Sequence, residues 1–220
     1  MSIPTIAEAA PGVDAGYLLG DLGELDQVRA LAAELTAGHG RLDVLVHDAG
    51  ALLMHYRATS TGNEVTVASQ VAGPYLLTGL LLALLRASAP SRVIQVSSGG
   101  MYTERYELDK LEMEPSVYDG TVAYARAKRA QLVLMNEWAR RSTGSGVVFH
   151  AMNPGWADTV AWLAAAPEAV VTDGRFRLDR HPRWENMVSY PLSPSPRSRT
   201  AGGVPSPHTR TCRTRPGRRR

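Results

Sequence analysis

The chain has 220 residues, 44% of them hydrophobic, which is enough to bury one core of ordinary size, so we expect a single main domain. Its formal net charge is +3, but residues 189–220 hold eight Arg and no acid, and removing eight positive charges from +3 leaves −5 for the body. A mildly acidic body excludes a uniformly basic nucleic-acid-binding domain, and we expect no nucleic-acid partner.

Cysteine content and hydropathy indicate the cellular compartment of the protein and whether it spans a membrane. The single cysteine, Cys212, excludes an internal disulfide and favours a reducing, cytoplasmic location. Residues 1–12 lack the basic start and apolar run of a secretory signal. The most apolar stretch, residues 75–85, is shorter than the roughly 20 residues that span a bilayer. We therefore expect a buried core helix there and no membrane span.

Two kinds of periodicity alternate along the chain. Short apolar runs typical of strands occupy residues 15–20, 42–46, 92–97 and 147–152. Helical spacing of apolar residues predicts helices at about residues 25–37, 62–86 and 121–141. Strands that are apolar on both sides and alternate with helices predict an α/β fold, with a parallel sheet covered on both faces.

Polar and glycine residues follow each predicted strand. They are Asp21, residues 47–50, residues 97–100 and residues 153–155. Ligands of open parallel sheets bind beyond the carboxyl ends of the strands. We therefore expect these four segments to gather at one edge of the sheet.

The helix predicted at residues 121–141 carries Tyr124 and Lys128, which lie one turn apart on one helix face. A tyrosine hydroxyl can give a proton to a carbonyl that is being reduced, and a nearby ammonium stabilises the resulting phenolate. The hydroxyl of Ser98, at the neighbouring strand end, can hydrogen-bond the developing oxyanion. A Tyr-x-x-x-Lys pair also occurs on ordinary surface helices, so catalysis is favoured by two further features, the serine-bearing strand and the strand that ends in Pro-Gly at residues 154–155.

This order of strand with Ser, helix with Tyr and Lys, and strand ending in Pro-Gly resembles the short-chain dehydrogenase/reductase (SDR) superfamily, over roughly residues 21–159. Residues 96–101, 118–121 and 153–159 look most like its dehydrogenase/reductase member 12 group, which is related to retinol dehydrogenases. The resemblance implies a Rossmann-like, doubly wound, three-layer α/β/α fold. It also implies an NAD or NADP cofactor, a small carbonyl or alcohol substrate, and a homodimer formed through helices near residues 77–85 and 131–138.

The resemblance also assigns roles to single residues. Ser98, Tyr124 and Lys128 would be the catalytic serine, tyrosine and lysine, with Tyr124 and Lys128 also contacting the cofactor. Gln70 stands where the family has a fourth catalytic residue, an asparagine. The other cofactor contacts would be Asp21 and Leu22 at the adenine, Ala49 and Gly50 along the cofactor, and Pro154, Gly155 and Thr159 at the nicotinamide. The histidines and the cysteine fall in no metal-ligand spacing, so no metal is expected.

Several segments depart from the family pattern. The first strands and the Gly-x-x-x-Gly-x-Gly phosphate turn have no counterpart, and residues 16–23 offer glycines at the wrong spacing. His47 and Asp48 replace two asparagines, and Asp48 adds a carboxylate near the expected cofactor. Pro74 should kink the helix that carries Gln70. The segment after residue 159 is short, although residues 173–179 still resemble the family's last strand.

We therefore expect a partial SDR domain at residues 1–188 and a basic Pro/Ser/Arg-rich tail at residues 189–220 that buries no core. The first hypothesis for function is an NAD(P)-dependent oxidoreductase that transfers hydride between a nicotinamide cofactor and a carbonyl or alcohol. The alternative is a non-catalytic SDR fragment that binds no cofactor because the Gly-rich motif is missing.

Overall fold

A computed structural model of the chain describes residues 12–153, 158–171, 176–178 and 181–182. The chain divides into two units, Met1–Met187 and Val188–Arg220, and the second lies outside the described residues. The predicted tail at residues 189–220 falls there, as do residues 154–157 and the flanks of the predicted last strand. The description below is of the first unit.

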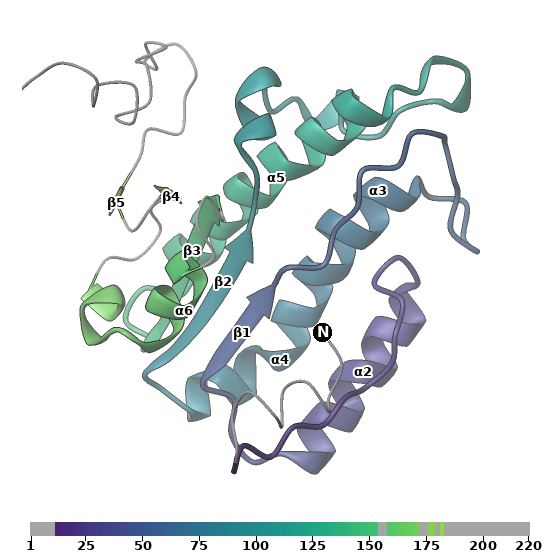
Figure 1. The fold of residues 1–220 in the computed structure, drawn as a ribbon. Coiled ribbons are helices and arrows are strands. Elements are labelled where there is room, and N and C mark those ends of the chain that lie inside the picture. The colour runs from purple at the N-terminus through teal and green to yellow at the C-terminus, as the bar shows by residue number, and fades with distance from the viewer. Residues whose placement is uncertain (1–11, 154–157, 172–175, 179–180, 183–220) are drawn as a thin grey trace, which may run out of the picture. The chain divides into compact units, whose positions relative to one another are not determined.

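The described strands form one sheet in the order β1-β2-β3-β4-β5 (Figure 1). The strands β1 (Val44–His47), β2 (Ser91–Val96), β3 (Val147–Asn153) and β4 (Phe176–Leu178) are mutually parallel, and β5 (His181–Pro182) pairs antiparallel with β4. Every residue of β3 except Asn153 is buried, as expected of a parallel strand covered on both faces. The apolar runs at residues 42–46, 92–97 and 147–152 were predicted correctly as strands, to within two residues at each end.

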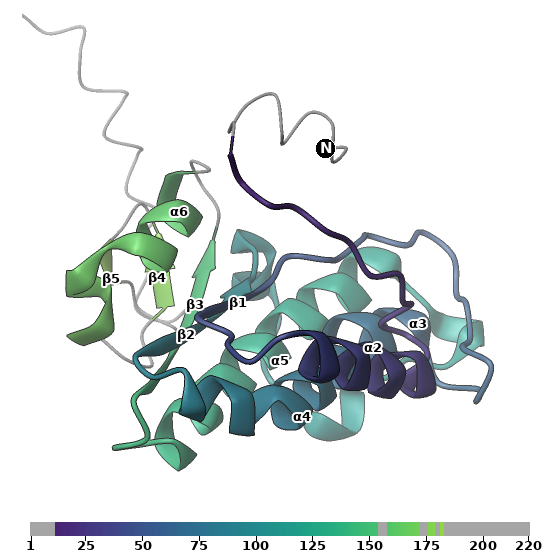
Figure 2. The ribbon, with the colours of Figure 1, turned by 90° about the horizontal axis from the view of Figure 1, so that it is seen from below.

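Helices cover both faces of this sheet. Three of them, α2 (Leu25–Gly38), α4 (Gly73–Ala87) and α5 (Gly120–Arg141), pack on one face around Val93 and Phe149. On the other face, α6 (Asp158–Ala165) and the 3-10 helix η5 (Pro167–Val171) pack around Ile94 and Met152. Figure 2 shows α6 on the opposite side of the strands from α4 and α5. The architecture is therefore α/β and Rossmann-like, as predicted.

The remaining described elements are short. They are the helix α3 (Val65–Val67), the π-helical segment η1 (Ala68–Ala72), and the 3-10 helices η2 (Gly99–Thr103), η3 (Leu108–Lys110) and η4 (Pro115–Val117). The last three lie in the long connection between β2 and α5.

Pro74 lies in the first turn of α4, just after the π-helical segment η1, which joins α3 to α4, and the kink remains a prediction. Pro74 has no N–H, so the carbonyl of Gln70, four residues earlier, lacks its helical donor. The side chain of Gln131 on α5 supplies one, because its Nε2 donates to Gln70 O at 2.8 Å. A side-chain amide on a neighbouring helix thus satisfies the carbonyl that Pro74 leaves without a partner.

The helical stretch Val65–Ala87 is long and apolar enough to cross a membrane by length and composition. In the structure, Leu77, Leu81 and Leu85 on this stretch are at most 7% exposed and belong to the core that includes α2, α5 and the sheet. This packing agrees with the expectation of a core helix.

The predicted strand at residues 15–20 is wrong. These residues have no assigned secondary structure, and Tyr17 and Leu19 are 71% and 88% exposed. A strand forms only with a hydrogen-bonding partner, and within the described residues β1 pairs with β2 alone. Apolar composition was therefore insufficient to place this segment in the sheet.

Candidate functional site

Helix α5 presents Tyr124 and Lys128 beside the carboxyl end of β2. Its N-terminus is fixed by Asp119, whose carboxylate accepts from the backbone N–H groups of Thr121 and Val122 at 2.9 and 3.1 Å. The ammonium nitrogen of Lys128 lies 5.4 Å from the ring centroid of Tyr124, within cation–π distance. The pair predicted from the one-turn spacing is therefore together in space.

Lys128 is 3% exposed, and its Nζ donates to Val96 O at 3.1 Å. Burial lowers the pKa of Lys128 to about 8, although the nearby Asp48 carboxylate acts in the opposite direction. A lysine in this condition can change its protonation state near neutral pH, which is the property that proton-transfer chemistry requires.

Two adjacent serines at the end of β2 have different environments. The buried Ser97 donates its hydroxyl to Lys128 O at 2.9 Å, which ties the strand end to α5. The partly exposed Ser98 accepts from Gly100 N at 3.2 Å and caps η2. Ser98 can therefore donate its hydroxyl proton to a ligand, whereas Ser97 already donates its hydroxyl proton to Lys128 O.

Gln70 and Gly50 meet next to Lys128. A Cβ added to Gly50 would lie 2.9 Å from Gln70 Oε1 and 3.3 Å from Lys128 Nζ, so only glycine leaves this space open. Gln70 Oε1 is buried without a hydrogen-bond partner, while its Nε2 donates to Ala51 O at 2.7 Å. A buried amide oxygen without a partner marks a place where a water or ligand donor would be stabilised.

The hydroxyl of Tyr118 positions the segment that follows Gly50. The Tyr118 hydroxyl donates to Leu53 O at 3.3 Å and also lies 3.0 Å from Thr66 Oγ1. Gly120 approaches the same carbonyl from α5, because a Cβ there would lie 2.0 Å from Leu53 O. The chain at Leu53 is therefore positioned by a hydrogen bond from Tyr118 and by the close approach of Gly120 at the start of α5.

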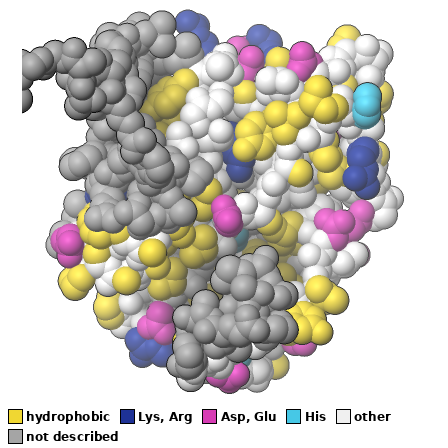
Figure 3. Space-filling model, viewed as in Figure 1, with side chains coloured by type: hydrophobic (Ala, Val, Ile, Leu, Met, Phe, Trp, Pro, Cys, Tyr) yellow, Lys and Arg dark blue, Asp and Glu magenta, His cyan; other side chains and the backbone are white. Residues whose placement is uncertain are grey.

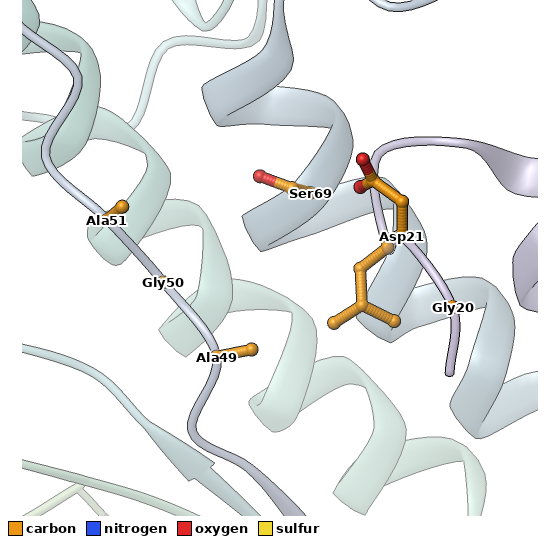
Figure 4. A pocket seen from close by; sticks show the side chains of 7 residues that line it. Gly20, Asp21, Ala49, Gly50, Ala51 and Ser69 are labelled. Atoms are coloured by element: carbon orange, nitrogen blue, oxygen red, sulfur yellow. The ribbon is translucent and has the colours of Figure 1, made fainter. Parts of the chain in front are cut away.

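The predicted cofactor residues near the first helix line a common pocket of about 510 Å³. Its lining includes Asp21, Leu22, Ala49, Gly50 and, unpredicted, Ser69. Figure 4 shows Gly20 and Asp21 on one side of this pocket and Ala49, Gly50 and Ala51 on the other. Asp21 Oδ1 accepts from Gly23 N at 2.7 Å, which shapes the turn before α2.

Other predicted residues are placed elsewhere or lie outside the description. Pro154 and Gly155 fall outside the described residues, and Thr159 lies in α6 with only its backbone described. His47 is 5% exposed and its Nε2 lies 2.8 Å from Thr78 Oγ1, so it is a buried strand residue. Burial lowers the pKa of His47 to about 4. Within the part of the chain that the structure describes, no group of three or more His, Cys, Asp or Glu side chains could hold a metal ion.

The sequence analysis did not identify Ser69 or Gln131, and it placed Ser97 at the sheet edge without assigning it a role. Pro74 offered a signal for Gln131, since a proline inside a helix leaves the carbonyl four residues earlier without a donor. No comparable signal distinguished Ser97 from Ser98, because both follow the same apolar strand.

Comparisons with known proteins agree with this geometry. A family model described as Enoyl-(Acyl carrier protein) reductase matches residues 3–175. Dehydrogenase/reductase SDR family member 12 of Bos taurus is 34% identical, over 70% of this chain and 57% of its own length. Retinol dehydrogenase 13 of Homo sapiens is 36% identical, over 63% of this chain and 42% of its own length. The chain thus spans about half the length of these curated relatives.

Two solved bacterial proteins illustrate the likeness in fold. An uncharacterised protein of Mycobacterium paratuberculosis superposes with a TM-score of 0.62 at 28% identity, over 71% of this chain and 60% of its own. A Brucella ovis oxidoreductase of the SDR family, solved with a partially ordered NAD, has a TM-score of 0.57 at 23% identity, over 77% and 81% of the two chains. Taken with a family model that covers most of the sequence, the parallel sheet and the placement of Tyr124 and Lys128 beside β2 show that the chain belongs to the short-chain dehydrogenase/reductase superfamily.

Proposed function

We propose that this protein is an NAD(P)-dependent oxidoreductase of the SDR type that interconverts a carbonyl and an alcohol. The observation that carries the proposal is the buried Lys128, whose ammonium lies beside the Tyr124 ring and next to Gly50 and Gln70. When bound, a nicotinamide cofactor would supply or accept the hydride. The rest of the chemistry depends on side chains of this chain.

The described residues fit one part of such a cofactor. The pocket of about 510 Å³ beside Asp21 and Leu22 is large enough for an adenine-bearing group, and Gly50 leaves open the space next to Gln70 Oε1 and Lys128 Nζ. Asp21 and Leu22 would hold the adenine end, Ala49 and Gly50 the middle, and Lys128 and Tyr124 the nicotinamide ribose. Pro154, Gly155 and Thr159 remain predicted nicotinamide contacts.

Each catalytic side chain would have a separate task in this proposal. The Tyr124 hydroxyl gives a proton to the substrate oxygen as negative charge builds there, and the Lys128 ammonium stabilises the phenolate that remains. Ser98, whose own hydroxyl proton is not used by the capping bond from Gly100 N, donates to the same substrate oxygen. Gln70 Oε1 accepts a hydrogen bond from a water that returns the proton by way of Lys128.

The alternative function is an SDR-type domain that binds no cofactor and is not catalytic, and a specific observation favours it. Among the described residues that line the pocket beside Asp21 there is no Lys or Arg, and Asp21 itself contributes a carboxylate. A pyrophosphate would therefore meet no positive charge among the lining residues.

Cofactor titration separates the two functions. We expect NADH or NADPH, titrated into the purified chain by calorimetry, to bind with micromolar affinity. Gly50→Val should weaken this binding at least about tenfold, because the added side chain fills the space beside Gln70 and Lys128. Gly40→Val is the matched control, since no atom lies within 4 Å of a Cβ at Gly40. No binding at millimolar cofactor would refute the oxidoreductase and support the alternative.

A second measurement tests the role of Tyr124. Tyr124→Phe should lower carbonyl reduction by at least about 10²-fold, because it removes the proton donor and keeps the ring. The affinity for cofactor should change little. Tyr106→Phe, which removes a hydroxyl from a 39% exposed tyrosine, is the control and should leave the rate unchanged. Equal rates for Tyr124→Phe and the unmodified chain would assign the proton transfer to another group.

The proposal extends to assembly and location. We propose the homodimer on the long helices that the family resemblance implies, and Tyr75 and Leu80 of α4, each 41% exposed, support an apolar contact there. The presence of one cysteine in the whole sequence supports a reducing, cytoplasmic location.

A further inference from the structure

Gln131 on α5 makes a hydrogen bond that the helical stretch containing Pro74 cannot make for itself. Its Nε2 donates to Gln70 O at 2.8 Å, in place of the N–H that residue 74 would supply in a regular α-helix. The donor and the carbonyl belong to different elements, α5 and η1. The backbone at Gln70 is therefore fixed by the same helix that carries Lys128.

The side chain of Gln70 reaches from this backbone position toward Lys128. Its Nε2 donates to Ala51 O at 2.7 Å, and its Oε1 lies at the space that Gly50 leaves open. Gln70 Oε1 and Lys128 Nζ lie 2.9 and 3.3 Å from the position of a Cβ on Gly50. The negative end of the Gln70 amide is therefore close to the Lys128 ammonium.

These three side chains form a buried polar cluster. Figure 3 shows Lys, Arg, Asp and Glu side chains scattered over the surface of the molecule. In contrast, Gln70, Lys128 and Gln131 are 1%, 3% and 2% exposed. Electrostatic effects are screened less by solvent in a buried cluster than at the surface. The position of the Gln70 amide therefore affects how strongly Lys128 holds its proton.

We propose that Gln131 is a positioning residue, which holds Gln70 Oε1 beside Lys128 Nζ by fixing the Gln70 backbone carbonyl. Without the Gln131 amide, this buried carbonyl would lose its donor, and η1 would have to shift to find another. The shift would move the Gln70 side chain away from Lys128. In the proposed function, on which this consequence rests, Gln131 keeps in place the oxygen that binds the proton-returning water.

The titration of Lys128 tests this positioning and needs neither cofactor nor substrate. The lysines of the sequence are Lys110 and Lys128, so labelling with [ε-13C]lysine in a Lys110→Arg background gives one NMR signal. We expect it to titrate near pH 8. Gln131→Met keeps the length of the side chain and removes the donor. It should lower the midpoint by about half a pH unit, because the Gln70 oxygen no longer stabilises the ammonium.

The other groups that act on Lys128 are left unchanged in this test. Among the described residues, the titratable groups that face Lys128 are Asp48, whose carboxylate raises the pKa of Lys128, and Tyr124, whose ring centroid lies 5.4 Å from Nζ. Every variant retains both. A change in the midpoint therefore reports the position of the Gln70 amide.

A double-mutant cycle identifies the route by which Gln131 acts. Gln70→Met should lower the midpoint by the same amount, and adding Gln131→Met should cause no further fall, because Gln131 acts through Gln70. Combining Gln131→Met with Pro74→Ala should restore the original midpoint, since residue 74 then has an N–H for Gln70 O. Met135→Ala is the matched control. It removes a 3% exposed core side chain of α5, so it should destabilise the fold and leave the midpoint unchanged.

An unchanged midpoint in Gln131→Met would overturn the proposal and leave Gln131 with a role in stability alone. An equal fall in Met135→Ala, a further fall on combining the Gln70 and Gln131 variants, or no recovery with Pro74→Ala would also overturn it. None of these results depends on whether the chain binds a nicotinamide cofactor. The cofactor titration decides that question separately.

Discussion

Replacing Gly120 by alanine is expected to destabilise the protein by about 3 kcal/mol or more. Gly120 begins α5, and a Cβ there would lie 2.0 Å from Leu53 O and 3.1 Å from Met54 Cα. Both neighbours are backbone atoms, so relief requires moving α5 away from the segment that follows Gly50. For a domain of this size the loss corresponds to a fall in Tm of roughly 6–12 °C, measurable by calorimetry.

A second variant and a control make this prediction specific. Gly73→Ala should behave like Gly120→Ala, because its Cβ would lie 2.1 Å from Leu22 O. Gly79→Ala, in the middle of α4, should instead raise the free energy of unfolding by about 0.5–1 kcal/mol, since alanine favours a helix. Its Cβ would meet only the Trp138 ring, at 3.7 Å. A Tm for Gly120→Ala within a degree of that for the unmodified chain would contradict the close approach of α5 to Leu53.

Acidification is expected to remove about 3 kcal/mol of stability for each of two buried histidines, His47 and His150. Burial lowers the pKa of each to about 4 from its ordinary value of 6.5, and positive charge on Arg177 and Arg92 also lowers that of His150. Between these values the unfolded chain binds a proton that the folded chain excludes. The free energy of unfolding should therefore fall as the pH drops from about 6.5 to about 4.

Urea titrations across this pH range would measure the effect. His47→Gln and His150→Gln together should flatten the profile between pH 6.5 and 4, whatever their effect at neutral pH. His55→Gln, at an exposed histidine, is the control and should leave the slope unchanged. Below this range, acid lability has a second origin, because Arg140 and Arg141 hold the pKa of Glu137 at about 2. A profile that stays equally steep without His47 and His150 would assign the loss to other groups.

Much of the fold could be predicted because its signals are local. The runs at residues 42–46, 92–97 and 147–152 and the helical spacing of α2 and α5 follow from side-chain periodicity, which a single element expresses by itself. The placement of Tyr124 beside Lys128 was predictable for the same reason, since residues four apart always share a helix face. The strand predicted at residues 15–20 was wrong because a strand also requires a hydrogen-bonding partner elsewhere in the chain, which local periodicity does not specify.

Several of the predicted site residues lie together in the structure, but their roles stay predictions and their interactions could not be predicted from the sequence. Asp21, Leu22, Ala49 and Gly50 line one pocket. Ala49 and Gly50 follow strand β1, as residues at the end of a parallel strand should, whereas Asp21 and Leu22 follow a segment that forms no strand. That Ser97 rather than Ser98 binds the Lys128 carbonyl depends on the direction in which each side chain leaves the end of β2. The roles of Ser69 and Gln131 likewise come from contacts between separate elements.

The sequence by itself determined the strands at residues 42–46, 92–97 and 147–152 with the helices between them, the edge of the sheet at which reactive side chains gather, and the pairing of Tyr124 with Lys128. Each of these follows from spacing within one element or from the direction of parallel strands. Only the tertiary structure decided that Lys128 is desolvated, that Gln70 Oε1 remains without a partner, and that β1 ends the described sheet with residues 15–20 unpaired. Desolvation and strand pairing depend on atoms distant in the chain, which local sequence patterns do not specify.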